Sequence, residues 1–183
     1  IDSHFHIWSQ ADLPWLMGPM QPRIFGPYEP IRRDYPIAEY LADARAAGVT
    51  QSVYVQANWA ADRYLDEVAY VADASKRSGH PIAIVAYADM LAEDVRPQLD
   101  ALSTEPTVRG VRMQLHWHEN VLYRFAKKPD LCRDATLQRN IARLGERGWS
   151  FDLQVFAGQM AAAAALATAC PDVTFVLQHA GML

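Results

Sequence analysis

Short apolar segments alternate with longer amphipathic segments along the whole chain. The short segments are rich in Val, Ile, Leu and aromatic residues, which is typical of buried strands. They predict strands at residues 2–8, 51–57, 82–88, 110–116, 150–156 and 173–179. The longer segments show helical spacing of apolar residues and predict helices at residues 37–47, 62–78, 92–103, 135–147 and 158–169, with Asp62 as the N-cap of the second. Because strands and helices alternate, we expect parallel strands with helices packed outside, in an α/β fold.

Residue parity within the strands distinguishes an open doubly wound sheet from a barrel. Successive side chains of a strand point to opposite faces, and a strand covered by helices on both sides is apolar throughout. Here one face is polar near the strand ends: it carries Ser52, Tyr54, Gln56 and Asn58 in the second strand, Arg112, Gln114, His116 and His118 in the fourth, and Asp152 and Gln154 in the fifth. This pattern favours a (β/α) barrel with a site at its C-terminal mouth. An ordinary sheet with a polar cavity is the alternative.

Two histidines near the start of the chain are candidate ligands. On a strand, His4 and His6 leave the same face about 7 Å apart at the backbone, so both rings can reach one ligand or one metal ion. His179 ends the sixth strand and faces the same mouth. We therefore expect these three imidazoles to converge on one site. The alternative is that His4 and His6 are ordinary residues near a terminus.

Residues 9–36 interrupt the alternation of strands and helices. This segment contains six prolines and is too long for a simple connection. We interpret it as a lid, from which Trp8 or Trp15 closes over the site.

Composition excludes several classes of function. The 183 residues carry a net charge of −4 without a basic block, which argues against nucleic acid as a partner. No apolar run approaches the length of about 18 residues that a membrane span needs, so we expect no membrane association. Two cysteines without a Cys-x-x-Cys spacing indicate a reducing compartment, and we expect a cytoplasmic protein.

Five segments together resemble the amidohydrolase-related (amidohydrolase 2) family of the amidohydrolase superfamily, with its lactonase-like branch the most similar. The segments are residues 1–8 (IDSHFHIW), 110–115 (GVRMQL), 120–126 (NVLYRFA), 149–155 (WSFDLQV) and 178–181 (QHAG). The resemblance implies a (β/α)8 TIM barrel whose site at the mouth contains His4, His6 and His179, joined by an Asp from the eighth strand. It also implies a divalent metal ion, of which zinc is the first candidate, held by these three histidines. Catalysis without a metal is the alternative.

The chain departs from many superfamily members at two places. Gln154 stands where a ligand His of the fifth strand is common, and Arg112 or Gln114 where a bridging Lys or Glu occurs on the fourth. We therefore expect no binuclear metal centre.

The expected function is the opening of a lactone of a sugar acid or of a pyrone-type dicarboxylic acid by activated water. His4, His6, His179 and Arg112 are the expected catalytic residues, with Arg112 gripping a substrate carboxylate. The expected substrate-binding residues are Tyr54, Gln56, Asn58, Trp59, Gln114, His116 and His118. Two alternatives stay open: a metal-dependent decarboxylase of an aromatic or unsaturated acid on the same barrel, and a non-catalytic binding barrel. The expected partner is a small molecule, and the oligomeric state is not predicted.

The number of strands predicts an incomplete barrel. Eight strands close a barrel of this class, and six are counted here. We expect residues 1–183 to form a single barrel domain that lacks strands 7 and 8, with the general base on a strand beyond Leu183. We further expect that the first and sixth strands do not pair directly.

Overall fold

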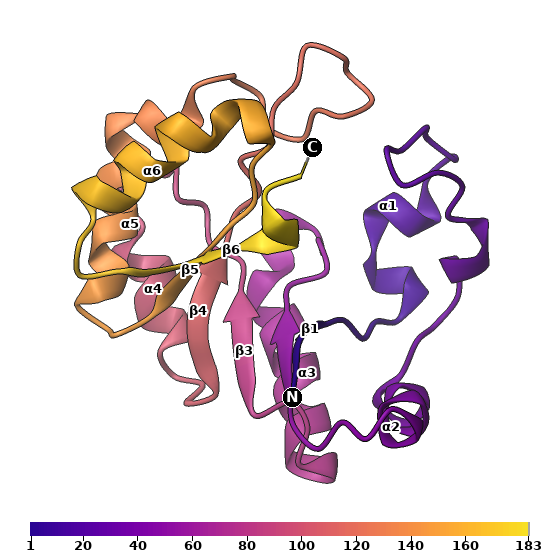
Figure 1. Ribbon diagram of the computed structural model, residues 1–183. Coiled ribbons are helices and arrows are strands. Elements are labelled where there is room, and N and C mark those ends of the chain that lie inside the picture. Colours follow the sequence, from indigo (N-terminus) through magenta and orange to yellow (C-terminus); the bar gives the residue numbers. More distant parts are fainter. Residues whose placement is uncertain (183) are drawn as a thin grey trace. The chain divides into compact units, whose positions relative to one another are not determined.

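The computed structural model describes residues 1–182 and has the predicted α/β fold, with strands and helices alternating (Figure 1). The strands are β1 (Asp2–Phe5), β2 (Ser52–Val55), β3 (Ala83–Ala86), β4 (Val108–Arg112), β5 (Ser150–Leu153) and β6 (Thr174–Leu177). The helices are α1 (Pro14–Met17), α2 (Ile37–Ala46), α3 (Tyr64–Ser78), α4 (Arg96–Leu102), α5 (Ala135–Gly145) and α6 (Met160–Ala169). The strand order follows the chain, with β1 and β6 at its two ends.

The chain divides into two compact units. The first unit comprises Ile1–Tyr87 and Leu102–Val108, and the second comprises Ala88–Ala101 and Arg109–Leu183. That residues 1–183 form a single barrel domain therefore stays a prediction.

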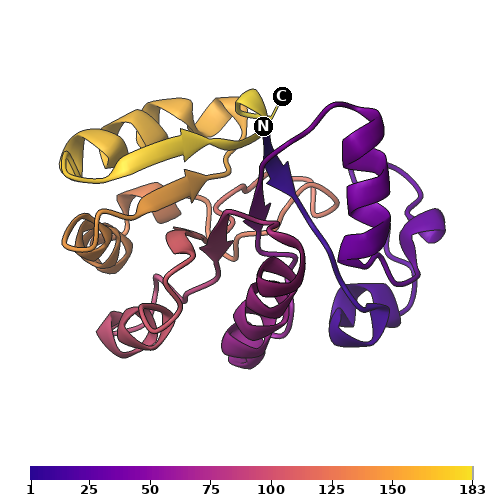
Figure 2. The same cartoon turned by 90° about the horizontal axis from the view of Figure 1, so that it is seen from below.

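In the first unit, β1 pairs in parallel with β2, and β2 with β3. Helix α3 packs against β3 (Figure 2). The helix ends at Gly79, which adopts the left-handed conformation that glycine accepts at no steric cost (φ 77°). Tyr54, in the middle of β2, and Ile7, just past β1, are completely buried, so the core of this unit surrounds the first two strands.

The proline-rich segment of the first unit is packed against the rest of that unit and is not an open loop. It contains α1 and two short 3-10 helices, Gln10–Asp12 and Glu29–Ile31. Leu13 and Leu16 are fully buried. Its role as a lid stays a prediction.

In the second unit, β4 pairs in parallel with β5, and β5 with β6. Asp134 caps α5, because its carboxylate accepts hydrogen bonds from the backbone N–H groups of Thr136 and Leu137. The apolar face of α5, with Leu137, Ile141 and Leu144, is buried.

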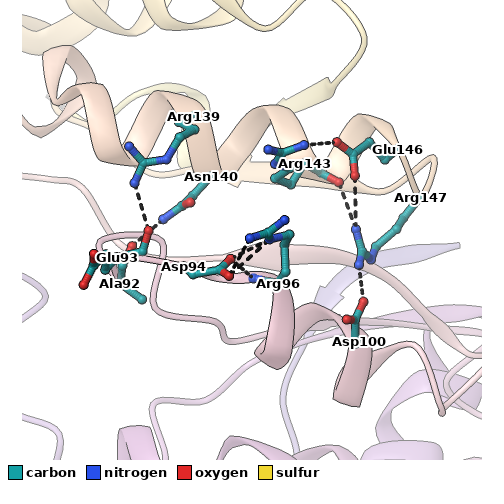
Figure 3. Close-up of polar contacts among 10 residues, drawn as sticks. All are labelled: Ala92, Glu93, Asp94, Arg96, Asp100, Arg139, Asn140, Arg143, Glu146 and Arg147. Atoms are coloured by element: carbon teal, nitrogen blue, oxygen red, sulfur yellow. Dashed lines mark hydrogen bonds and ion pairs between the residues drawn. The ribbon is translucent and has the colours of Figure 1, made fainter.

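A polar clamp fastens residues 88–101 to α5 (Figure 3). The buried Asn140 donates from Nδ2 to the backbone oxygens of Met90 and Ala92, at 3.0 and 2.7 Å. Arg139 donates to the backbone oxygen of Glu93 at 2.9 Å. These hydrogen bonds satisfy backbone carbonyl groups of residues 88–101, which are not paired in the sheet. Because the donors lie on α5, residues 88–101 belong to the second unit.

Ion pairs extend the clamp along α5 and α4 (Figure 3). Arg147 contacts Asp100 of α4, and Arg143 contacts Glu146 at 2.6 Å. Arg143, Glu146 and Asp100 are solvent-exposed in these pairs, and exposed ion pairs contribute little to stability. The buried Asn140 is therefore the energetic centre of the clamp.

Several predicted boundaries are wrong. Each strand stops two to four residues before its predicted end, because the apolar pattern continues past the residues that pair in the sheet. Helix α4 begins at Arg96 instead of residue 92, since the carboxylate of Asp94 accepts from the Arg96 N–H and the preceding carbonyls bind the clamp. Asp62 is not the N-cap of α3: it lies in a short 3-10 helix, and Arg63 takes the cap position without a side-chain bond.

Candidate functional site

The first unit brings the two N-terminal histidines together. The Nε2 atoms of His4 and His6 lie 3.2 Å apart, and the two rings are nearly perpendicular, with centroids 4.9 Å apart. The Nδ1 of His6 lies 2.6 Å from the backbone oxygen of Val55, at the end of β2. A carbonyl can only accept, so Nδ1 carries the hydrogen and the Nε2 of a neutral His6 keeps its lone pair.

This arrangement fits one metal ion. Two imidazole nitrogens at about 2.0–2.1 Å from a tetrahedral ion are about 3.3 Å apart, close to the 3.2 Å found here. The bond from His6 to Val55 is the kind of outer hydrogen bond that orients a ligand histidine. No cluster of three or more His, Cys, Asp or Glu side chains with metal-binding geometry occurs in residues 1–182. The first unit therefore provides two fitting ligands, and His179 as the third stays a prediction.

The end of β2 is held from several directions. The Ala57 N–H donates to the carboxylate of Glu67 at 2.5 Å, and the Trp15 indole donates to the Ala57 oxygen at 3.0 Å. Asn58 has a left-handed backbone (φ 62°), and its N–H donates to the side-chain oxygen of Gln56 at 2.7 Å. Trp15, one of the two tryptophans expected to close over the site, thus reaches the strand end.

The expected substrate-binding residues in and just after β2 differ in exposure. Tyr54 and Gln56 are buried, and the Tyr54 hydroxyl donates to Glu67 at 2.8 Å. Trp59 is also buried and lies under the guanidinium of Arg63, 5.0 Å from its ring centroid. Asn58 is partly exposed. Trp8, the other candidate from the long segment, donates to the Arg33 oxygen at 2.6 Å and packs beside Tyr35.

The second unit gathers a separate group of polar residues. Arg112, at the end of β4, is only 3% exposed and lies opposite Asp152 in the register of β4 and β5. Asp152 is also 3% exposed, and it accepts a hydrogen bond of 2.6 Å from the Gln178 amide that follows β6. Arg112, Asp152 and Gln178 therefore link the ends of three adjacent strands.

Burial is the main cause of the pKa shifts of the ionisable side chains in this group. Burial raises the pKa of Asp152 to about 6, although Arg112 and the Gln178 amide act in the opposite direction. Burial also lowers the pKa of His116 to about 4, with smaller contributions from the charges of Arg112 and His179. The pKa of His179 is lowered by partial loss of solvent and then by Arg112. At neutral pH the imidazoles of His116 and His179 are therefore uncharged and can donate or accept a proton.

The predicted polar face beyond Arg112 is not part of a strand. Strand β4 ends at Arg112, so alternation does not place Gln114, His116 and His118. The His116 ring is instead buried against Phe125 and Phe156. His118 is exposed and accepts from the Asn120 N–H at 3.0 Å, while Gln114 is half-buried.

His179 is displaced from the predicted sixth strand. Strand β6 ends at Leu177, and His179 lies in the following 3-10 turn with a left-handed backbone (φ 52°). Only a few per cent of residues other than glycine adopt positive φ. Its convergence with His4 and His6 stays a prediction.

Two buried carboxylates, Asp152 and Glu67, are additional candidates that the predicted set of site residues did not include. Asp152 shares its strand face with Gln154, so strand alternation already placed it on the polar side. Glu67 lies one turn before Val71 on the apolar face of α3, and a charged residue in such a position signals a buried partner.

The whole chain, residues 1–183, matches the protein family described as Amidohydrolase. The chain belongs to this amidohydrolase family. It is 31% identical over 184 residues to the uncharacterized protein y4mH of Sinorhizobium fredii, covering all of this chain and 62% of that protein. It is 23% identical over 180 residues to the L-fucono-1,5-lactonase of Burkholderia ambifaria, covering 98% of this chain and 56% of that enzyme.

A solved amidohydrolase has the same fold. The crystal structure of an amidohydrolase from Burkholderia multivorans with bound zinc superposes with a TM-score of 0.73 at 26% identity, covering 99% of this chain and 57% of that chain. The predicted fold, an amidohydrolase-type TIM barrel truncated after its sixth strand, is thereby confirmed. The described residues include no helix long and apolar enough to cross a bilayer.

Proposed function

We propose that the chain carries six strands of the barrel of a hydrolase that opens a lactone of a sugar acid or of a pyrone-type dicarboxylic acid. The observation that carries this proposal is the His4–His6 pair, with Nε2 atoms 3.2 Å apart and the His6 ring oriented by Val55. Membership of the amidohydrolase family and the distant likeness to an L-fucono-1,5-lactonase support it.

His4 and His6 would hold a divalent ion, with His179 as the third ligand and zinc as the first candidate. When bound, such an ion polarises a carbonyl oxygen and lowers the pKa of a water molecule to about 7. The hydrogen bond to Val55 keeps the lone pair of His6 on Nε2, the atom that faces His4.

The second unit supplies charge recognition and proton transfer. Arg112 remains protonated at any working pH and attracts the carboxylate that appears when a lactone opens. Asp152 is the register partner of Arg112 on β5, and its carboxylate, when ionised, partly offsets the positive charge of the Arg112 guanidinium. His116 is neutral above pH 4 to 5, and its buried Nδ1 has no hydrogen-bond partner among the described residues. Because buried polar atoms without a partner are rare, we assign a substrate hydroxyl or carbonyl as the partner of this nitrogen.

The test is a lactonase assay with matched variants. The natural full-length protein that contains this chain is incubated with L-fucono-1,5-lactone and with 2-pyrone-4,6-dicarboxylate, with added Zn²⁺ or with EDTA, and acid release is followed. We expect ring opening of one lactone, and a loss of at least about 100-fold in His6→Asn. Arg77→Gln, which breaks an exposed ion pair with Asp73 on α3, is the control and keeps its activity.

The two alternative functions give different results in the same experiment. Release of carbon dioxide from an aromatic or unsaturated acid, without lactone opening, would identify a decarboxylase. Saturable binding without any product would identify a binding protein. Either result refutes the lactonase proposal.

A further inference from the structure

Glu67 is a buried acid that the proposed reaction does not use. It lies in the first turn of α3 and is only 2% exposed. Removing a carboxylate from water is costly unless hydrogen bonds compensate. Its Oε1 accepts from the Tyr54 hydroxyl at 2.8 Å and from the Ala57 N–H at 2.5 Å. The positive end of the α3 dipole also favours a carboxylate at this position.

The two donors to Glu67 flank the group that orients His6. Val55 stands between Tyr54 and Ala57, and its carbonyl is the acceptor for His6 Nδ1. Tyr54 is fully buried, and its ring meets the His6 ring edge to face at 6.3 Å between centroids. Glu67 thus fixes the strand on both sides of the Val55 carbonyl and also the ring against which His6 packs.

We propose that Glu67 is a positioning residue that holds the His4–His6 pair in its metal-binding geometry through the end of β2. It does not contact either imidazole in this scheme. It restrains the Val55 carbonyl, which determines the tautomer of His6 and therefore which nitrogen presents a lone pair to His4. This inference rests on the proposed function only in assigning a metal to the pair.

The first measurement concerns the metal-free protein. Long-range ¹H–¹⁵N spectra of the imidazoles, with His6 assigned by its absence in His6→Asn, report which His6 nitrogen carries the hydrogen. We expect the Nδ1–H tautomer in the wild type and a mixture of tautomers in Glu67→Met, which has a similar volume but no oxygen acceptor. Glu67→Gln retains an acceptor oxygen and restores the wild-type spectrum.

The second measurement is the affinity for Zn²⁺ alone, determined by competition with a chromogenic chelator. Loss of an outer hydrogen bond to a ligand histidine weakens metal binding by about 10- to 100-fold, and we expect this range for Glu67→Met. Tyr54→Phe removes one of the two donors and weakens binding by about fivefold. Asp66→Asn, on the exposed face of the same helix, is the matched control and leaves both measurements unchanged.

The outcomes separate this inference from the lactonase proposal. If wild-type protein binds no Zn²⁺, the metal assignment fails, and the His6 tautomer in metal-free protein still decides the role of Glu67. A folded Glu67→Met with the wild-type tautomer and an affinity within about twofold overturns the inference. If Glu67→Met does not fold, as judged by circular dichroism, an unchanged tautomer and unchanged affinity in Tyr54→Phe overturn it.

Discussion

Asp152 and His116 make opposing contributions to the pH dependence of stability. The pKa of Asp152 rises from its ordinary 3.8 to about 6 in the folded protein. The folded state therefore binds this proton more tightly than the unfolded state, and stability falls as the pH rises from 4 to 6. At about 1.4 kcal/mol per pH unit, the ionised carboxylate costs about 3 kcal/mol at neutral pH.

His116 acts in the same pH range with the opposite sign. Its pKa falls from 6.5 to about 4 in the folded protein, so only the unfolded state gains a proton as the pH drops below 6.5. The stability present at neutral pH is lost between pH 6.5 and 4, by about 3 kcal/mol. In the wild type the two effects offset each other.

Replacing either residue removes its contribution to the pH dependence of stability and leaves the opposite contribution of the other. Asp152→Asn removes the carboxylate and keeps an acceptor for Gln178, so we expect the variant to lose about 3 kcal/mol relative to the wild type as the pH falls from 6.5 to 4. His116→Phe should show the reverse and gain a similar amount relative to the wild type. The comparison of variant with wild type at each pH cancels the titration of every other group.

The assay is urea unfolding in the presence of EDTA, followed by tryptophan fluorescence at half-unit steps between pH 4 and 7. Asp94→Asn is the control, because a hydrogen bond with Arg96 lowers the pKa of Asp94 to about 2. Its titration in the folded state lies below this range and in the unfolded state only reaches the lower end of it, so the difference from wild type should change little between pH 7 and 5. A constant difference for Asp152→Asn as well would refute the reasoning, since it would mean that burial does not raise the pKa of Asp152.

Three further predictions concern the second unit. Asn140→Ala leaves two carbonyl oxygens without their donor and should lower the free energy of unfolding by about 2–4 kcal/mol. Arg139→Ala, on the exposed part of the clamp, should lower it by less than about 1 kcal/mol. Similar values for both variants in urea unfolding would contradict the central role of Asn140. Asp134→Ala removes the cap of α5 and should cost about 1 kcal/mol, and an unchanged urea midpoint would exclude this role. Cys132 and Cys170 are buried with raised thiol pKa values, so a thiol reagent should label them only after unfolding; rapid labelling of the native protein would disprove this expectation.

The sequence alone determined the order and type of the six strands and of helices α2 to α6, and the family. Apolar strands and amphipathic helices have different periods of hydrophobicity, and each period is a local property that survives without tertiary contacts. Parity predicted that His4 and His6 meet on one face, and their Nε2 atoms do lie 3.2 Å apart, although β1 ends at Phe5 and His6 follows it. The predicted strand ends were less accurate, because the apolar pattern of the sequence continues past the last residues that pair in the sheet.

Tertiary structure decided which polar residues are buried and what they contact. Gln114, His116 and His118 follow the end of β4, where strand alternation no longer applies, so their exposure depends on packing against residues such as Phe125 and Phe156. Glu67 and Asp152 acquire their roles from donors 10 and 26 residues away along the chain, Ala57 and Gln178. Periodicity identifies which face a residue occupies. Only the folded chain determines its solvent exposure, hydrogen-bond donors and nearby charges, and these set the protonation and the chemistry of a site.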